Sequence, residues 1–334
     1  MERAHETDNL SRFDPASRKG FYESYFLRGN DPERPRAFWI KFTVFAPLGR
    51  PHREAEGELW AVFFHGPDGS KTAVKEAHPF ENCLFARDRF EVRAGRGTLS
   101  AGASRGECAS GGHHIRWDLS YRADGPSLHF LPEWAYASPF PKAKGLSPCP
   151  DTTWEGWLEV DGLKIDVTGW RGSQNHNWGT KHTDRYAWAQ CNVFEGAPDT
   201  YMEMMSARLK IGPVWTPAIS FLVLNHRGRP VRFHSPRSFF RARARFPSTF
   251  EWHLSVDNGT ESARCRVEGE KETFAGLRYR NPPGGAHACL NSKIASSEIL
   301  LFRDGKQVDR LVSSFTTAFE ILTDEHGHGI PMLV

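Results

Sequence analysis

A glutamate inside an otherwise apolar segment is the residue whose surroundings point most directly to chemistry. Glu203 lies in Tyr201-Met202-Glu203-Met204-Met205, a run whose residue types predict a β-strand. Successive strand residues point to opposite faces, so Tyr201, Glu203 and Met205 share one face. A carboxyl group buried among apolar side chains has a raised pKa, and it then acts as a general acid near neutral pH.

Two other interpretations of Glu203 are open at this stage. The strand could lie at the surface with the carboxylate in water, or Glu203 could form a buried structural pair with Arg208 or His176. Carboxyl groups with perturbed pKa values also occur in structural networks, so spacing alone does not separate these interpretations from catalysis.

The densest cluster of polar and aromatic residues precedes Glu203, in the segment GWRGSQNHNWGTKHTDRYAWAQ over residues 169–190. In the predicted strand over residues 186–194, small apolar residues alternate with large aromatic and amide-bearing ones. The large face has the character of a ligand-cavity wall, and the alternative is a wide core face with two satisfied amides. The candidate binding residues of this region and the next strand are Asn177, Tyr186, Trp188, Gln190, Asn192 and Met205.

The elements that must position these residues are predicted to be strands. Aromatic runs over residues 38–45 and 58–64 are typical of strands, and Asp161-Gly162 is typical of a two-residue hairpin turn. The segment over residues 313–322 fits either a short helix or a closing strand. The aromatic content of 13% and the frequent Gly and Pro residues favour an all-β fold with many turns.

Length and composition exclude several function classes. The 334 residues suggest two domains, with strand density restarting near residues 170–185. A net charge of +3 argues against a dedicated nucleic-acid binder, and the absence of a long apolar run argues against stable membrane insertion. No signal peptide is visible, and the six cysteines are scattered, which indicates a reduced, cytoplasmic protein. Oligomeric state is not indicated.

The common motifs for phosphate, dinucleotide, zinc-protease and serine-hydrolase chemistry are missing from the sequence. The histidines near the C-terminus and the cysteines lack the spacing of metal ligands. We therefore expect neither a cofactor nor a metal. The functions that remain are ligand binding and acid–base chemistry on an apolar molecule.

The run SQNHNWG followed by a Tyr/Trp-rich strand resembles the carotenoid 1,2-hydratase (hydroxyneurosporene synthase) family. It is similar, more loosely, to tocopherol cyclase-like proteins and lipocalin-like Diels–Alderases. The family pattern of His-x-Trp followed by Tyr-x-Asp is matched by His176-Asn177-Trp178 and Tyr201-Met202-Glu203, with Glu in place of Asp. The match is specific around residues 169–205 and architectural elsewhere.

The resemblance implies two tandem lipocalin-like antiparallel β-domains, which we place at residues 19–178 and 179–334 after a flexible N-terminus over residues 1–18. It further implies an apolar pocket near their junction and chemistry that uses neither metal nor redox cofactor. In the hydratases an acid protonates an isoprenoid alkene, and water captures the resulting cation. In the cyclases an internal hydroxyl captures it.

By this resemblance the catalytic candidates are Glu203 as the acid, His176 to orient or deprotonate, Trp178 to stabilise the cation and Tyr201 to hydrogen-bond the acid or water. The expected function is a cofactor-independent hydratase, cyclase or isomerase, classed as a lyase or isomerase, of a lipophilic isoprenoid or polyene substrate. The alternatives are a pericyclase of a polyene and a non-catalytic carrier of a hydrophobic ligand on the same fold.

Overall fold

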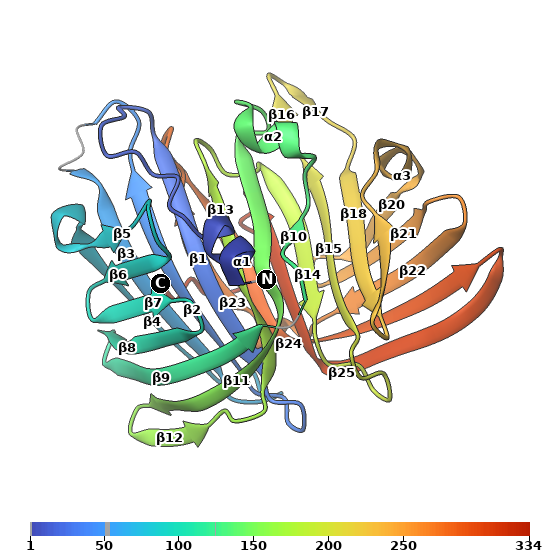
Figure 1. The fold of residues 1–334 in the computed structure, drawn as a ribbon, viewed down its shortest axis with the longest axis horizontal. Helices are drawn as coiled ribbons and strands as arrows, with labels where there is room; N and C mark the ends of the chain where they lie inside the picture. The colour runs from blue at the N-terminus through green and yellow to red at the C-terminus, as the bar shows by residue number, and fades with distance from the viewer. Residues whose placement is uncertain (1, 51–53, 124) are drawn as a thin grey trace.

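Antiparallel strands make up most of the chain, so the expected all-β fold class is confirmed. The computed structural model describes residues 2–50, 54–123 and 125–334. Two large sheets account for the fold, and they follow one another along the sequence. Figure 1 shows them side by side, the first in blue to green and the second in yellow to red.

The first sheet, sheet A, is 13-stranded and has the order β4-β3-β2-β1-β13-β11-β9-β8-β7-β6-β5, with β10 and β12 paired to β11. Its strands are β1 (Phe21–Asn30), β2 (Ala37–Ala46), β3 (Glu56–Phe64), β4 (Lys71–Pro79), β5 (Leu84–Phe85), β6 (Glu91–Ala94), β7 (Gly97–Ser100), β8 (Ala103–Ser110), β9 (His113–Ala123), β10 (Leu128–His129), β11 (Ala143–Val160), β12 (Leu163–Asp166) and β13 (Arg171–Gly179).

The second sheet, sheet B, is 10-stranded and has the order β19-β18-β15-β14-β25-β24-β22-β21-β20, with β23 paired to β24. Its strands are β14 (Arg185–Cys191), β15 (Tyr201–Arg208), β18 (Ile219–His226), β19 (Arg229–Phe233), β20 (Arg243–Ser248), β21 (Glu251–Asp257), β22 (Glu261–Glu268), β23 (Ala275–Arg280), β24 (Ala286–Arg303) and β25 (Lys306–Thr323). A separate hairpin pairs β16 (Lys210–Ile211) with β17 (Val214–Trp215).

Helical segments are short. They comprise α1 (Glu2–Asp8), α2 (Glu133–Ala137), α3 (Pro236–Arg241) and the 3₁₀ turns η2 (Phe80–Asn82) and η3 (Lys271–Thr273). Within the described residues, none of the helices has the length and apolar character needed to cross a membrane.

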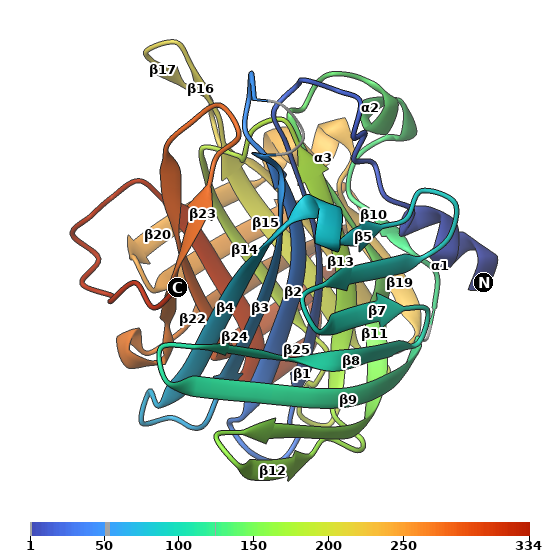
Figure 2. The ribbon, with the colours of Figure 1, turned by 90° about the vertical axis from the view of Figure 1, so that its left-hand side faces the viewer.

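Each sheet curls around its own hydrophobic core, and a third core lies between the sheets. Sheet A bends until β4 contacts β8, as Figure 2 shows from its side. Its inner face encloses a cluster that includes Phe42 and Trp154, and sheet B encloses one that includes Trp252 and Phe319. The backs of the two sheets meet through the third cluster, which comprises Ala37, Trp39, Trp60, Val62, Phe64, Ala275, Leu277, Tyr279, Cys289, Ile294 and Leu322.

Turn chemistry and bulges account for the local geometry. Asp161 and Gly162 both have positive φ, at 51° and 87°, so the predicted two-residue hairpin joins β11 to β12. The segment over residues 313–322, left open between helix and strand, belongs to the strand β25. Register shifts interrupt the pairing of the 18-residue strands β11, β24 and β25, and such bulges increase the curl of a sheet.

The N-terminal segment, for which we expected a flexible tail over residues 1–18, lies partly against sheet A. Residues 2–8 form α1, and Asn9, Ser11 and Phe13 are buried against sheet A. Sheet A ends at Gly179 and sheet B begins at Arg185. We propose on this basis that the division at 178/179 separates two structural halves.

Candidate active site

A cavity of about 160 Å³ lies between the backs of the two sheets. Strands β1, β2, β11 and β13 of sheet A contribute one wall, and strands β14, β15, β18, β23 and β25 of sheet B contribute the other. The side chains and backbone around it belong to Tyr22, Phe26, Lys41, Phe130, Leu131, Ala143, Lys144, Gly145, Leu146, Asn175, His176, Asn177, His182, Thr183, Tyr186, Trp188, Glu203, Met205, Phe221, Tyr279 and Glu320.

Glu203 is the carboxyl group that the fold buries most completely in this wall, with 1% of the residue exposed. The indole of Trp188 donates a hydrogen bond to its Oε1 at 2.8 Å. Its Oε2 accepts hydrogen bonds from Ser147 Oγ at 2.8 Å and from Gln190 Nε2 at 3.1 Å. A carboxyl oxygen has two lone pairs, so Oε1, with its one hydrogen bond, has room for a proton.

The environment shifts the titration of Glu203 towards neutral pH. Burial raises its pKa to about 7, and the hydrogen bonds from Ser147 and Trp188 and the charge of Arg28 offset this effect only in part. The interpretation of Glu203 as a solvated surface residue is therefore wrong. The partners suggested for a structural pair, Arg208 and His176, are also not the groups that bind its carboxyl oxygens.

A fully buried arginine from sheet A, Arg28, hydrogen-bonds the residues that hold Glu203. Arg28 donates from Nε to Gln190 Oε1 at 2.8 Å and hydrogen-bonds Asn192 through its guanidinium. Asn192 in turn donates to Asp151 Oδ1 at 2.9 Å. Gln190 and Asn192, which we expected to contact substrate, therefore lie in the network that holds Glu203 and outside the cavity lining.

A second carboxylate, Glu320, also faces the cavity, from β25. Its Oε1 accepts hydrogen bonds from Lys293 Nζ at 2.7 Å and Asn291 Nδ2 at 2.9 Å. Glu320 on β25 pairs in register with Trp188 on the neighbouring strand β14. The indole of Trp188 also donates its hydrogen bond to Glu203 on β15. Trp188 therefore stands between an ion-paired carboxylate and a protonatable carboxyl group.

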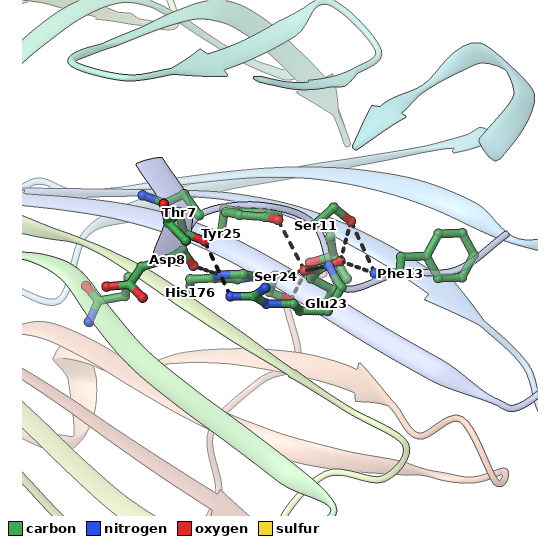
Figure 3. A network of polar contacts seen from close by, with 12 residues as sticks. Thr7, Asp8, Ser11, Phe13, Glu23, Ser24, Tyr25 and His176 are labelled. Atoms are coloured by element: carbon green, nitrogen blue, oxygen red, sulfur yellow. Dashed lines mark hydrogen bonds and ion pairs between the residues drawn. The ribbon is translucent and has the colours of Figure 1, made fainter. Parts of the chain in front are cut away.

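The two rings of the His-x-Trp motif lie on the opposite face of β13 from Glu203. Asn175, on the Glu203 side, donates to Ser147 Oγ, whereas His176 points to the other face. There its Nε2 is 2.8 Å from Glu23 Oε1, its Nδ1 is 2.8 Å from the carbonyl oxygen of Asp8, and its ring stacks on Tyr25 (Figure 3). Both ring nitrogens are thus engaged in a structural network.

Two further catalytic candidates are also displaced from the acid. The Trp178 ring is tilted against that of His176, with ring centroids 4.8 Å apart, and lies beneath the guanidinium of Arg12. Tyr201 shares the Glu203 face, but it lines a separate hollow beside Asp151 and Arg232. The structure therefore places the rings of His176 and Trp178 on the far face of β13 and Tyr201 at a separate hollow, and their expected catalytic roles stay predictions.

Six of the predicted site residues do come together around the cavity: Asn177, Tyr186, Trp188, Glu203, Met205 and, through its position on β13, His176. Sequence reasoning missed Arg28, Lys41, Lys293 and Glu320. Lys41 carries a visible signal, since it is a single charge in the apolar run FWIKFTVF. Across the described ranges, no group of three or more His, Cys, Asp or Glu side chains is arranged to hold a metal ion.

Comparison with known proteins agrees with this architecture. The model of the tocopherol cyclase-like family matches residues 150–322, whereas no curated protein sequence matches the chain. The structure is similar to kievitone hydratase from Nectria haematococca, with 11% identity, a TM-score of 0.55, and coverage of 95% of this chain and 92% of that chain. It is also similar to CghA, with 11% identity, a TM-score of 0.57, and coverage of 96% and 97%.

These likenesses span both sheets, so the two-part lipocalin-like fold is shared along the whole chain. The tocopherol cyclase-like match covers β15 with Glu203, β14 with Trp188 and β25 with Glu320, which are the strands that carry the acid and its neighbours. The resemblance expected from the sequence is confirmed at this level. Because the family model covers more than half of its length, this chain belongs to the tocopherol cyclase-like family.

Proposed function

We propose that the protein is a cofactor-independent hydratase, cyclase or isomerase that protonates an alkene of a lipophilic isoprenoid or polyene substrate. The observation that carries this proposal is a buried carboxyl group with a pKa of about 7 in the wall of an aromatic cavity. Membership of the tocopherol cyclase-like family and the fold shared with kievitone hydratase support an enzyme of this kind.

The proposed chemistry uses the residues that the fold brings together. The Glu203 carboxylic acid gives its proton to one alkene carbon, the π bond breaks, and a C–H bond and a tertiary carbocation form. The indole of Trp188, held beside Glu203, stabilises the cation through its electron-rich face. In a hydration, water forms the C–O bond and its proton returns to the Glu203 carboxylate. In a cyclisation, a hydroxyl of the substrate takes the place of water.

This assignment moves the cation-stabilising role from Trp178 to Trp188. It also assigns Gln190, Ser147 and Arg28 to positioning the acid rather than to contacting substrate. The remaining cavity wall, with Phe26, Met205 and Phe221, suits an apolar chain.

The first test compares the small molecules that co-purify with the wild-type protein and with Glu203→Gln. We expect the inactive variant to retain substrate, which organic extraction and mass spectrometry would identify. The compound from the variant is then incubated with fresh wild-type protein in D₂O. The product should contain one carbon-bound deuterium, with the mass of one added water for a hydratase and without it for a cyclase or isomerase.

Glu203→Gln should lower this turnover by about 10²-fold or more, which is typical for loss of a general acid. Trp178→Phe serves as the matched control and should retain turnover, because its ring lies on the far face of β13. Deuterium incorporation that persists in Glu203→Gln would overturn the assignment of the acid. A rearranged product without deuterium would indicate a pericyclase, and the same unaltered lipid in every sample would indicate a carrier.

A further inference from the structure

A buried lysine on the sheet A side of the cavity has no part in the chemistry proposed above. Lys41 lies in β2 and is 5% exposed, and it lines the cavity together with Tyr279. Its Nζ is 3.7 Å from the centroid of the Tyr279 ring and 5.4 Å from that of Trp60. The ammonium group therefore rests in an aromatic setting at the edge of a ligand-sized space.

No carboxylate among the described residues lies within ion-pair distance of Lys41. Glu58, a sheet A carboxylate whose charge acts on Lys41, is bound by Lys75 at 3.0 Å and by Arg280 at 2.7 Å. Glu320, on the sheet B wall, is bound by Lys293 at 2.7 Å. Once these pairs are matched, Lys41 remains as a cation without an anionic partner.

The physical cost of this arrangement is large. A buried ammonium group loses its hydration, and aromatic faces replace only part of it. Burial lowers the pKa of Lys41 to about 8, even though Glu58 and Glu320 favour the charged form. At neutral pH the group still carries its proton. The imidazole of His182, which also lines the cavity, is held neutral because burial lowers its pKa well below the usual value.

We propose that the cavity binds an amphipathic substrate whose anionic oxygen group, such as a carboxylate, phenolate or enolate, pairs with the Lys41 ammonium. The apolar part of the substrate then lies along Phe26, Met205 and Phe221, with its alkene at Glu203. This inference rests on the proposed function in taking the cavity as the substrate site. It adds the class of head group and makes Lys41 a specificity-determining residue.

The first test is the thermal stability of the ligand-free protein in two matched variants, both of buried lysines at the junction. Lys41→Met replaces an unmatched ammonium by an apolar chain of similar length, so the midpoint of thermal unfolding should rise. Lys293→Met leaves Glu320 buried without its cation, so the midpoint should fall. A fall in both variants would show that Lys41 is a structural residue, and the proposal would be wrong.

The second test measures binding by calorimetry at pH 7 with two probes that share one isoprenoid chain, geranic acid and geraniol. The wild type should bind the acid at least about tenfold more tightly, as expected for a charge-assisted hydrogen bond. Lys41→Met should lose this preference and still bind geraniol. Lys144→Met removes another cation of the cavity wall, whose Nζ is bound to the carbonyl of Ser138, and should keep the preference.

Equal affinity of the wild type for the acid and the alcohol would overturn the proposal, as would loss of the preference in Lys144→Met as well as in Lys41→Met. These outcomes differ from failure of the proposed function. Preferential binding of the acid without any deuterium transfer would leave the Lys41 site in place and remove the catalytic assignment. Deuterium transfer to a neutral substrate, together with equal binding of geranic acid and geraniol, would support the catalytic assignment and remove the Lys41 site.

Discussion

At the scale of single residues, the pKa of Glu203 is set by opposing effects, of which burial is the largest. Three hydrogen-bond donors and the nearby Arg28 favour the ionised form, and loss of hydration opposes them more strongly. A carboxyl group whose pKa is higher in the folded state binds its proton more tightly there. Glu203 therefore contributes stability that is complete below about pH 4.5 and is lost as the pH rises through about 7.

This balance predicts a pH-dependent difference between the wild type and Glu203→Gln. Between pH 5 and pH 8 the free energy of unfolding of the wild type should fall by roughly 2–3 kcal/mol relative to the variant, because glutamine keeps the uncharged state. Urea denaturation of both proteins at several pH values measures this difference. A difference between the wild type and Glu203→Gln that stays constant over this pH range would contradict the prediction.

The residue scale also shows how far sequence could predict the site. A glutamate in an apolar strand was visible, and so was the aromatic face with Tyr186 and Trp188. The sequence did not show whether Trp178 or Trp188 lies beside Glu203, because motif spacing does not indicate which face of β13 turns to the cavity. That orientation depends on β13 pairing with β1 and β11, which are distant in sequence.

At the scale of elements, the alternation of β13 divides two functions between its faces. Its Asn175 side supports the acid, and its His176 side fastens the N-terminal segment. Glu23 on β1 is the centre of that attachment (Figure 3). It accepts hydrogen bonds from the hydroxyl of Ser11 and from the backbone N–H groups of Arg12 and Phe13, besides its contact with His176.

We predict that Glu23→Gln weakens this attachment. An amide cannot accept all of these hydrogen bonds, and each buried donor left without its acceptor costs about 1–3 kcal/mol. The variant should therefore unfold at lower denaturant concentration, and trypsin should cleave it faster at Arg12, which mass spectrometry would locate. Asp14→Asn, an exposed change in the same segment, is the control. Slow cleavage at Arg12 in both variants would show that the segment is held by other contacts.

Local elements were predictable where residue chemistry decides them. The Asp161-Gly162 hairpin follows from the backbone conformations that these residues tolerate, and the aromatic runs of β2 and β3 follow from strand preference. The buried N-terminal segment was not predictable. Its polar sequence is typical of a tail, and the partners of its backbone, which include the carboxylate of Glu23, the ring of His176 and the carbonyl oxygen of Ala86, are distant in sequence.

At the scale of the whole molecule, the site belongs to neither half alone. Glu203 and Trp188 come from sheet B, whereas Ser147, Lys41 and Arg28 come from sheet A. A strand pattern in one segment therefore cannot reveal the site, because its electrostatics arise only when the backs of the two sheets meet. Arg28 is the clearest case, since it is fully buried and its guanidinium reaches across to Gln190 and Asn192.

This arrangement predicts that an arginine of one half sets the acid strength of the other half. Arg28→Met should raise the pKa of Glu203 further above its wild-type value, because the charge that favours its ionised form is removed. It should also destabilise the protein by roughly 2–3 kcal/mol, because Gln190 and Asn192 lose a charged partner. The pKa is measured from the pH dependence of unfolding, by comparing Arg28→Met with the double variant that also carries Glu203→Gln.

Arg28→Lys separates charge from geometry in the same experiment. A lysine keeps the positive charge but lacks the planar fork that bonds Gln190, Asn192 and Asn30 together. We expect it to keep the midpoint of the Glu203 titration near 7 while losing part of the stability. If Arg28→Met leaves that midpoint unchanged, the acid is tuned within sheet B alone. A shift in Arg28→Met that Arg28→Lys reverses would show that packing of the two sheets sets the proton affinity of the site.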